Sequence, residues 1–299
     1  MLLNEIHCPT CDTSDVKIHT EYTVQGGETR RQYYCASCRC YFSETYGTAL
    51  AGLRTPLSRI QQILEALNDG MSLNATCRIF HVSKNTIALW HERLSPVKEA
   101  LRLYALCHQF VQQIIEGDEL YTKVNANQPP AESTGWTVVL MERASRFIWE
   151  LSCGERDRAL FKRAMRTLAD VVKRTDDLML LTDGERRYGS LLFEICQTVI
   201  RTGKRGRPRH TLPKGVHVRL KNKGSQAHRR GPKRPKYEAP QPEHPDTPAT
   251  IQEAEIHANH LEGFNAAIRR RVACYRRKTN TYAKKLSTAM SAGCALAPT

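Results

Sequence analysis

The chain has 299 residues, enough for two or three domains of about 100–200 residues each. Its 45 Lys and Arg outnumber its 30 Asp and Glu, and the net charge of +15 favours a polyanion such as nucleic acid as its partner. Hydrophobic residues make up 40% of the sequence, which excludes a wholly disordered chain. No apolar run reaches the roughly 18 residues of a membrane span, and a signal peptide is not evident. We therefore expect a cytoplasmic protein whose cysteines are thiols or metal ligands.

Two Cys-x-x-Cys pairs stand near the N-terminus, Cys8 with Cys11 and Cys35 with Cys38. A gap of two residues lets one turn direct both sulfurs at the same ion, and four thiolates suit the tetrahedral coordination of structural zinc. We predict a zinc ribbon with one Zn²⁺, which stabilises the fold and leaves no position open for catalysis. Cys40 is an alternative ligand, with a less suitable offset of one residue from Cys38. The alternative to a metal site is a set of unpaired thiols.

Three short helices are expected next. The apolar residues of 57–67 fall on one helical face, Ser72 opens a second helix, and Ser83 is suited to cap a third. In the second helix, three residues are expected to face inward: Ala75, Ile79 and Phe80. This order of elements is that of a helix-turn-helix.

The third of these helices carries the candidate DNA contacts. In a helix-turn-helix, the N-terminal residues of the last helix enter the major groove. This position predicts that Lys84, Asn85 and Ala88 point outward toward the bases, and that Arg93 contacts phosphate. The alternative is an ordinary three-helix packing unit without a role in DNA binding.

An α/β pattern follows the helices. It consists of an antiparallel meander of strands, an amphipathic helix and a fully apolar strand, at residues 114–124, 136–141, 147–151, 158–172 and 178–182. The apolar strand runs into Asp183 and Gly184. Open α/β sheets place ligand chemistry at the carboxyl ends of their strands, although Asp-Gly is also a common turn.

Apolar residues recur at helical spacing from Ile251 onward, which predicts one long helix. Glu255 and Glu262 lie seven residues apart on one face of it, with Asn265 and Arg269 beside Glu262. If carboxylates from two strands and this helix converge, they would hold two Mg²⁺ ions, which activate the attacking oxygen and stabilise the leaving oxygen in phosphoryl transfer.

Four segments carry a specific likeness: GDELYTKV, LTDGERRYG, HLEGFNAAIRRR and RRKTNTYAK. Together with the expected ribbon and helix-turn-helix, the chain resembles the DDE transposases of the insertion-sequence-one family. The resemblance implies a ribonuclease H-like domain in which Asp118, Asp183 and Glu262 bind two Mg²⁺ or Mn²⁺ ions. It also implies that Asn265 and Arg269 are polar positions of the DNA-contacting surface. Three rival carboxylates rank lower because they fall outside the motif positions: Glu119, Glu185 and Glu255.

The activity implied by this resemblance is cleavage and transfer of DNA strands at the ends of an insertion sequence. Its implied partners are double-stranded DNA, as element ends and target, and further copies of the chain in a dimer or larger synaptic complex. The implied location is the prokaryotic cytoplasm, in association with the nucleoid. An alternative is a catalytically inactive or truncated relative that regulates through DNA binding, since the chain ends soon after TNTYAK. A structure-directed nuclease on the same fold is a third hypothesis.

A basic, Pro-rich stretch separates the second acid from the third. Between Arg201 and Lys236 there are fourteen Lys and Arg and no Asp or Glu, which predicts a disordered insert. Within it, Arg205 and Arg207 flank a glycine in an arrangement that resembles an AT-hook, a minor-groove binder. A solvated polybasic linker is the alternative, and either would bind the DNA backbone in a salt-dependent way.

The expected fold class is α+β and multidomain. It comprises a zinc ribbon, a helix-turn-helix domain, an α/β ribonuclease H-like domain in two segments and the basic insert. Their expected ranges are residues 1–50 for the ribbon, 55–110 for the helices, 114–200 with 251–285 for the catalytic domain, and 201–250 for the insert.

Overall fold

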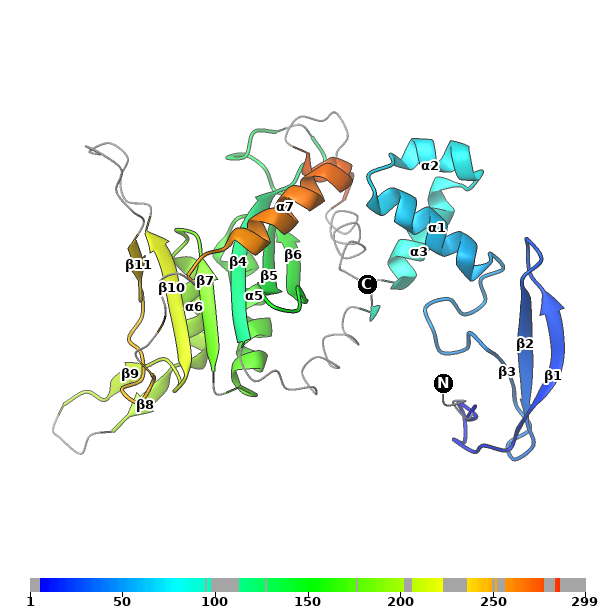
Figure 1. The fold of residues 1–299 in the computed structure, drawn as a ribbon, viewed down its shortest axis with the longest axis horizontal. Coiled ribbons are helices and arrows are strands. Elements are labelled where there is room, and N and C mark those ends of the chain that lie inside the picture. Colours follow the sequence, from blue (N-terminus) through cyan, green and yellow to red (C-terminus); the bar gives the residue numbers. More distant parts are fainter. Residues whose placement is uncertain are drawn as a thin grey trace. The chain divides into compact units, whose positions relative to one another are not determined.

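The chain forms two compact units, Met1–Glu99 and Ala100–Thr299, in a computed structural model (Figure 1). The structure describes residues 6–94, 96–97, 113–126, 128–175, 177–201, 206–222, 236–248, 251, 256–276 and 283–285. Within these ranges the protein is α+β, with six α-helices and three β-sheets.

The N-terminal unit begins with a three-stranded antiparallel sheet. Its strands are β1 (Val16–Thr23), β2 (Thr29–Cys35) and β3 (Tyr41–Ser43), with β2 in the middle. A buried arginine ties this sheet to the segment before the helices: the guanidinium of Arg30 donates to the carbonyl of Leu53 at 2.5 Å and to that of Thr55 at 2.8 Å. The three-stranded sheet and the segment that leads into the helices therefore lie in the same compact unit.

The three predicted helices are present: α1 (Leu57–Asn68), α2 (Leu73–Phe80) and α3 (Lys84–Leu94). Both predicted caps are confirmed, because the hydroxyls of Ser72 and Ser83 each accept a hydrogen bond from the backbone of the first turn, at 3.2 and 3.0 Å. Their shared core is made of four buried side chains, Ile60, Ile63, Ile87 and Trp90.

The prediction for the buried face of α2 was wrong in one respect. Ile79 is 57% exposed, whereas Thr76 is fully buried. The hydroxyl of Thr76 donates to the carbonyl of Ser72 at 3.1 Å, so this polar residue can face the core without an unsatisfied donor. Apolar spacing alone could not detect that pairing.

The C-terminal unit is built on a six-stranded sheet of order β11-β10-β7-β4-β5-β6. Its strands are β4 (Gln113–Tyr121), β5 (Trp136–Glu142), β6 (Ile148–Gly154), β7 (Leu178–Thr182), β10 (Val216–Asn222) and β11 (Lys236–Glu238). The predicted meander is confirmed, since β4, β5 and β6 pair antiparallel. Strand β7 lies parallel to β4 on one side and to β10 on the other.

Helices cover both faces of this sheet (Figure 1). Along β5, Val138 and Leu140 pack with α5 (Arg158–Val172) and α6 (Arg187–Cys196), whereas Val139 and Met141 pack with α7 (Asn259–Arg271). Because successive strand residues point to opposite faces, α5 and α6 lie on one face and α7 on the other. A short 3₁₀ turn, Ala273–Tyr275, follows α7.

The predicted disordered insert is partly wrong. Strand β10 belongs to the central sheet, where Val216, Val218 and Leu220 are buried despite the basic residues between them. The alternation of apolar and basic residues is that of a strand, and the high charge of the whole stretch concealed it. Two further short strands, β8 (Thr198–Ile200) and β9 (Arg209–Thr211), form a separate hairpin.

The predicted long helix also begins later than expected. Helix α7 starts at Asn259, and Ile251 is not helical. The buried carboxylate of Glu116 accepts a hydrogen bond from the backbone N–H of Leu261 at 2.7 Å, so a partner on β4 fixes where the helix begins. Glu255 lies outside the described residues.

Candidate functional site

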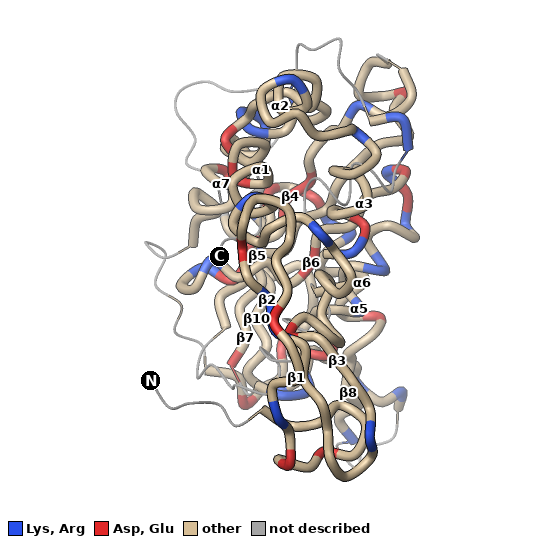
Figure 2. The backbone as a smooth tube through the Cα atoms, turned by 90° about the vertical axis from the view of Figure 1, so that its right-hand side faces the viewer, with Lys and Arg blue, Asp and Glu red and all other residues tan. Residues whose placement is uncertain are grey.

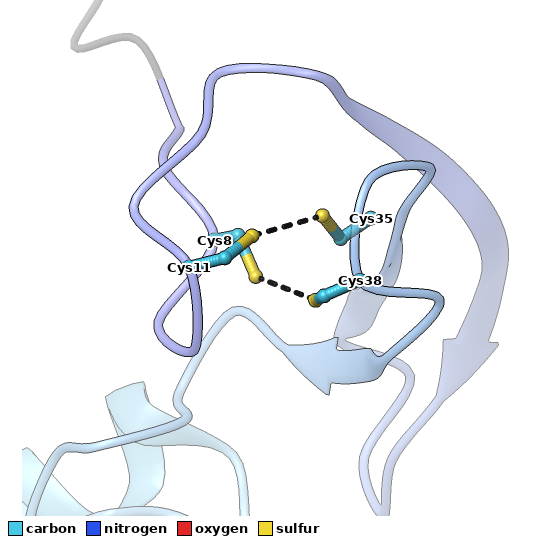
Figure 3. Close-up of side chains that lie close together, drawn as sticks. All are labelled: Cys8, Cys11, Cys35 and Cys38. Carbon is cyan, nitrogen blue, oxygen red and sulfur yellow. Dashed lines mark hydrogen bonds between the residues drawn. The ribbon is translucent and has the colours of Figure 1, made fainter.

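Four thiols come together beside the three-stranded sheet (Figure 3). The sulfur atoms of Cys8, Cys11, Cys35 and Cys38 all lie within 4.8 Å of one another. The Sγ atoms of Cys8 and Cys38 are 3.5 Å apart, and those of Cys11 and Cys35 are 3.6 Å apart. The spacing of the two pairs therefore predicted the cluster, and its donor set can bind zinc.

The two Cys-x-x-Cys turns have the same backbone geometry. The N–H of Asp12 donates to the carbonyl of Cys8, and the N–H of Arg39 donates to that of Cys35, both at 2.9 Å. Asp12 and Arg39 also share a positive φ, of 55° and 59°. This repeated turn directs both sulfurs of each pair toward the other pair.

A fifth cysteine lies at the same place. The Sγ of Cys40 is 3.1 Å from that of Cys38 and 3.5 Å from that of Cys8, so the rival ligand named from the sequence is within reach. Burial raises the pKa of Cys8, but hydrogen bonds from the backbone at Thr10 and Cys11 help to lower it to about 6. The thiolate is the form that binds a metal ion.

The predicted DNA-contacting residues of α3 are on its surface. Lys84, Asn85 and Ala88 are all exposed. Arg93 is half-buried, and its Nη1 donates to the carbonyl of Ala51 at 2.6 Å. Part of the Arg93 guanidinium therefore holds α3 against the segment before α1, a role that the sequence did not suggest.

Two of the three predicted acids stand side by side in the central sheet. Gly117 on β4 pairs with Thr182 on the parallel strand β7, and the next residues are Asp118 and Asp183. Gly184 then turns the chain with a φ of 76°. The carboxyl end of β7 thus carries one acid beside the other, as the apolar strand followed by Asp-Gly predicted.

The environment of Asp118 disfavours its charge. Burial raises its pKa to about 6, and the nearby charges of Glu119 and Asp183 add to the effect. Two hydrogen bonds act in the opposite direction, one from the backbone at Glu119 and one from the side-chain amide of Asn265 on α7, which donates to Asp118 Oδ2 at 2.7 Å. Concentrated negative charge of this kind is relieved by a bound cation.

The role predicted for Asn265 changes as a result. Asn265 is only 1% exposed, and its side-chain amide holds the Asp118 carboxylate, a contact that the sequence did not suggest. The third predicted acid, Glu262, is exposed on the preceding turn of α7. In the described part of the chain, ligand atoms of Glu262, Asp118 and Asp183 do not all lie within 4.8 Å of one another.

Two rival carboxylates are engaged elsewhere. Because successive strand residues point to opposite faces, Glu119 lies on the other face of β4 from Asp118, where it pairs with Arg156. Glu185 binds Arg187 at 2.7 Å and Arg156 at 3.4 Å. These ion pairs give both residues a structural role.

A second group of metal-ligating side chains was missed in the sequence. Glu116, His257 and His260 place one ligand atom each within 4.8 Å of the others. Glu116 precedes Asp118 by two residues on the same strand face, whereas the histidines lie just before and inside the start of α7. The signal available was His-x-x-His before a helix, but nothing local linked it to a strand residue about 140 positions earlier.

Basic residues are spread along the described backbone of both units, and acidic residues are interspersed among them (Figure 2). Of the candidate minor-groove residues, Arg207 is exposed and Arg205 lies outside the described residues. Arg269 on α7 is half-buried, whereas Arg270 and Arg271 are exposed.

The arrangement defines two kinds of candidate site, a thiol cluster suited to a structural ion and an acidic site at the carboxyl end of a parallel strand. No protein-family model and no curated protein matches the sequence. Across the described ranges, none of the helices combines the length and the apolar character needed to cross a membrane.

Proposed function

We propose that the chain is a DDE transposase that cleaves and transfers DNA strands with divalent metal ions. The observation that carries this proposal is the position of Asp118 on β4 beside Asp183, which directly follows the parallel strand β7, with Asn265 bound to Asp118 from the helix on that face. Two adjacent carboxylates with a raised pKa on one of them are typical of sites that bind Mg²⁺ or Mn²⁺.

The strand order supports a ribonuclease H-like fold for the C-terminal unit. Three antiparallel strands are followed by α5, and then β7 and β10 add in parallel beside β4. The first acid lies in the central strand β4 and the second at the end of its parallel neighbour. This order matches the layout implied by the family resemblance.

The donor set fits divalent ions. Asp118 and Asp183 supply hard oxygen ligands, and Glu262, exposed one helical turn from Asn265, is the third candidate for a site of two ions. When bound, such ions supply electrostatic stabilisation of the charge that develops at phosphorus. The chain's own contribution is orientation, because the amide of Asn265 fixes one oxygen of Asp118 and β7 fixes Asp183 beside it.

In this proposal the N-terminal unit binds the element ends. Lys84 and Asn85 would read the major groove from the start of α3, and the four thiolates would hold one structural Zn²⁺. Arg207 and the exposed arginines of α7 would contact the backbone of double-stranded DNA. Joining two ends requires at least two copies of the chain, and the DNA partner places it at the nucleoid.

One observation favours a second candidate, a regulator that binds DNA without cutting it. Glu262 is exposed and does not group with Asp118 and Asp183 in the described part of the chain. A site with two carboxylates and without the third would bind divalent metal ions more weakly and would lack cleavage activity.

The test compares two Asp→Asn variants of the full chain on duplexes that carry the sequences flanking the gene. Asp183→Asn is expected to abolish cleavage in Mg²⁺ or Mn²⁺ while DNA binding stays within about twofold. Asp170→Asn, on the exposed side of α5, is the matched control and should cleave like the wild type. Cleavage that survives Asp183→Asn would overturn the assignment, and binding without cleavage by the wild type would favour the regulator.

A further inference from the structure

We propose a second metal site, for a transition-metal ion of the Zn²⁺ class, formed by Glu116, His257 and His260. One carboxylate oxygen and one nitrogen of each imidazole lie within 4.8 Å of one another. Two imidazoles and a carboxylate are the protein ligands that Zn²⁺ and related ions prefer, in contrast to the all-oxygen set of the aspartate pair. The proposal does not depend on the function proposed above.

Among the described residues, one ring nitrogen of His257 lacks the partner that would otherwise explain its position. Nδ1 of His257 is buried and has no hydrogen-bond partner among the residues that the structure describes. The His257 and His260 rings lie side by side, with centroids 5.3 Å apart. A buried ring nitrogen without a partner costs free energy, and coordination of a metal ion removes that cost.

The carboxylate is held in place by its neighbours. Arg143 Nε donates to Glu116 Oε1 at 2.8 Å, and the backbone N–H of Leu261 donates to Oε2 at 2.7 Å. Arg143 also donates to the carbonyl of His257, so one guanidinium orients both a ligand and the backbone beside another ligand. Each carboxylate oxygen has a second lone pair that can bind an ion. Outer contacts of this kind usually orient metal ligands.

An ion at this place would join β4 to the start of α7. Glu116 is on the strand, His257 precedes the helix and His260 is in its first turn. Asn265 lies on the same helix and binds Asp118, so the ion would also fix the helix that orients the acidic site. The role assigned is therefore structural.

Cobalt substitution separates this site from the thiol cluster. Co²⁺ bound by thiolates gives intense sulfur-to-metal charge-transfer bands, whereas Co²⁺ bound by nitrogen and oxygen gives only weak visible bands. With the acidic site saturated by excess Mg²⁺, we expect the metal-free full chain to bind two Co²⁺ ions. His257→Gln combined with His260→Gln should remove one ion and the weak bands and leave the charge-transfer bands unchanged.

His244→Gln is the matched control, because His244 lies outside the cluster, near Asp246. It should retain both ions. Far-ultraviolet circular dichroism of the double variant without metal controls for unfolding, and its spectrum should equal that of the wild type. Binding of a single Co²⁺ by the wild type, with charge-transfer bands only, would overturn the proposal. So would two ions in the double variant with an unchanged spectrum.

Discussion

The two units of the molecule hold their candidate sites in different ways. In the N-terminal unit, the thiol site is itself part of the core beside the three-stranded sheet, because the buried Cys8 and Cys35 pack with Tyr33 and Phe42 and with the partly buried Val16 and Cys40. In the C-terminal unit, the sheet face covered by α5 and α6 already has a core of nineteen buried hydrophobic residues. The two aspartates lie outside this core, at the carboxyl end of β7 and beside it on β4. A three-stranded sheet with so few buried side chains needs a further source of stability, whereas a large core can tolerate charges at its edge.

The largest expected effect is the loss of metal from the thiol cluster. A structural zinc ion contributes roughly 10–16 kcal/mol of binding free energy, so Cys35→Ser or a strong chelator should unfold the ribbon. The C-terminal unit should keep its own unfolding transition. Thermal unfolding followed by circular dichroism checks this.

Cys196→Ser is the control for that comparison, since Cys196 lies at the end of α6, outside the cluster. It should leave the unfolding transition of the ribbon unchanged. An intact ribbon in the chelator-treated wild type would contradict the view that the metal stabilises this unit.

The second effect tests the large hydrophobic core of the C-terminal unit. Phe161 on α5 is fully buried and packs against Tyr188, with ring centroids 5.0 Å apart. Phe161→Ala should lower the free energy of unfolding of the C-terminal unit by about 3–5 kcal/mol. Urea unfolding should show the zinc-loaded N-terminal transition unchanged, and an equal shift of both transitions would show that the units unfold together.

The acidic site should reduce the stability of the metal-free sheet. The pKa of Asp118 is raised to about 6, first by burial and then by the charges of Glu119 and Asp183. For a raised pKa, stability is highest below about pH 4 and falls as pH rises through about 6. Asp118→Asn should therefore raise the free energy of unfolding at pH 7 by about 1–3 kcal/mol, with little change at pH 4.

Urea unfolding without divalent ions measures this difference. Asn265→Ala removes the donor to Asp118 Oδ2 and should lower the free energy of unfolding at pH 7, so it serves as the paired variant. A loss of stability in Asp118→Asn at pH 7 would show that its charge is stabilised rather than strained.

The smallest effect concerns an ion pair at the edge of the same unit. Burial raises the pKa of Glu243, but hydrogen bonds from His217 and Arg219 lower it to about 2. Its stabilising contribution is therefore complete above about pH 4.5 and is lost as pH falls toward 2. Glu243→Gln should cost about 1 kcal/mol at pH 7 and nothing at pH 2, as measured by urea unfolding.

What the sequence could predict depended on how far apart the contacting residues lie in the chain. The thiol cluster follows from two local turns, and the Asp183 position follows from an apolar strand that ends in Asp-Gly. Strand β10 was missed because basic residues alternate with its buried valines. The start of α7 was missed because Glu116, on a distant strand, determines it.

The same reason explains which contacts were missed within the candidate sites. Asn265 was assigned to DNA because its partner, Asp118, lies about 150 residues earlier. Arg93 was assigned to phosphate, although a carbonyl before α1 accepts a hydrogen bond from it. Side chains that meet only through tertiary packing leave no periodic or spacing signal in the sequence.

The central claim is that one unit binds DNA and the other cuts it, and one assay with two variants tests it most directly. Binding and cleavage of the same labelled duplex are measured for Lys84→Ala with Asn85→Ala, and for Asp183→Asn. The first variant is expected to bind about tenfold more weakly or worse, with cleavage restored at saturating protein. The second is expected to bind normally and not to cleave. Normal cleavage by Asp183→Asn, or weak binding caused by it alone, would contradict the division of roles.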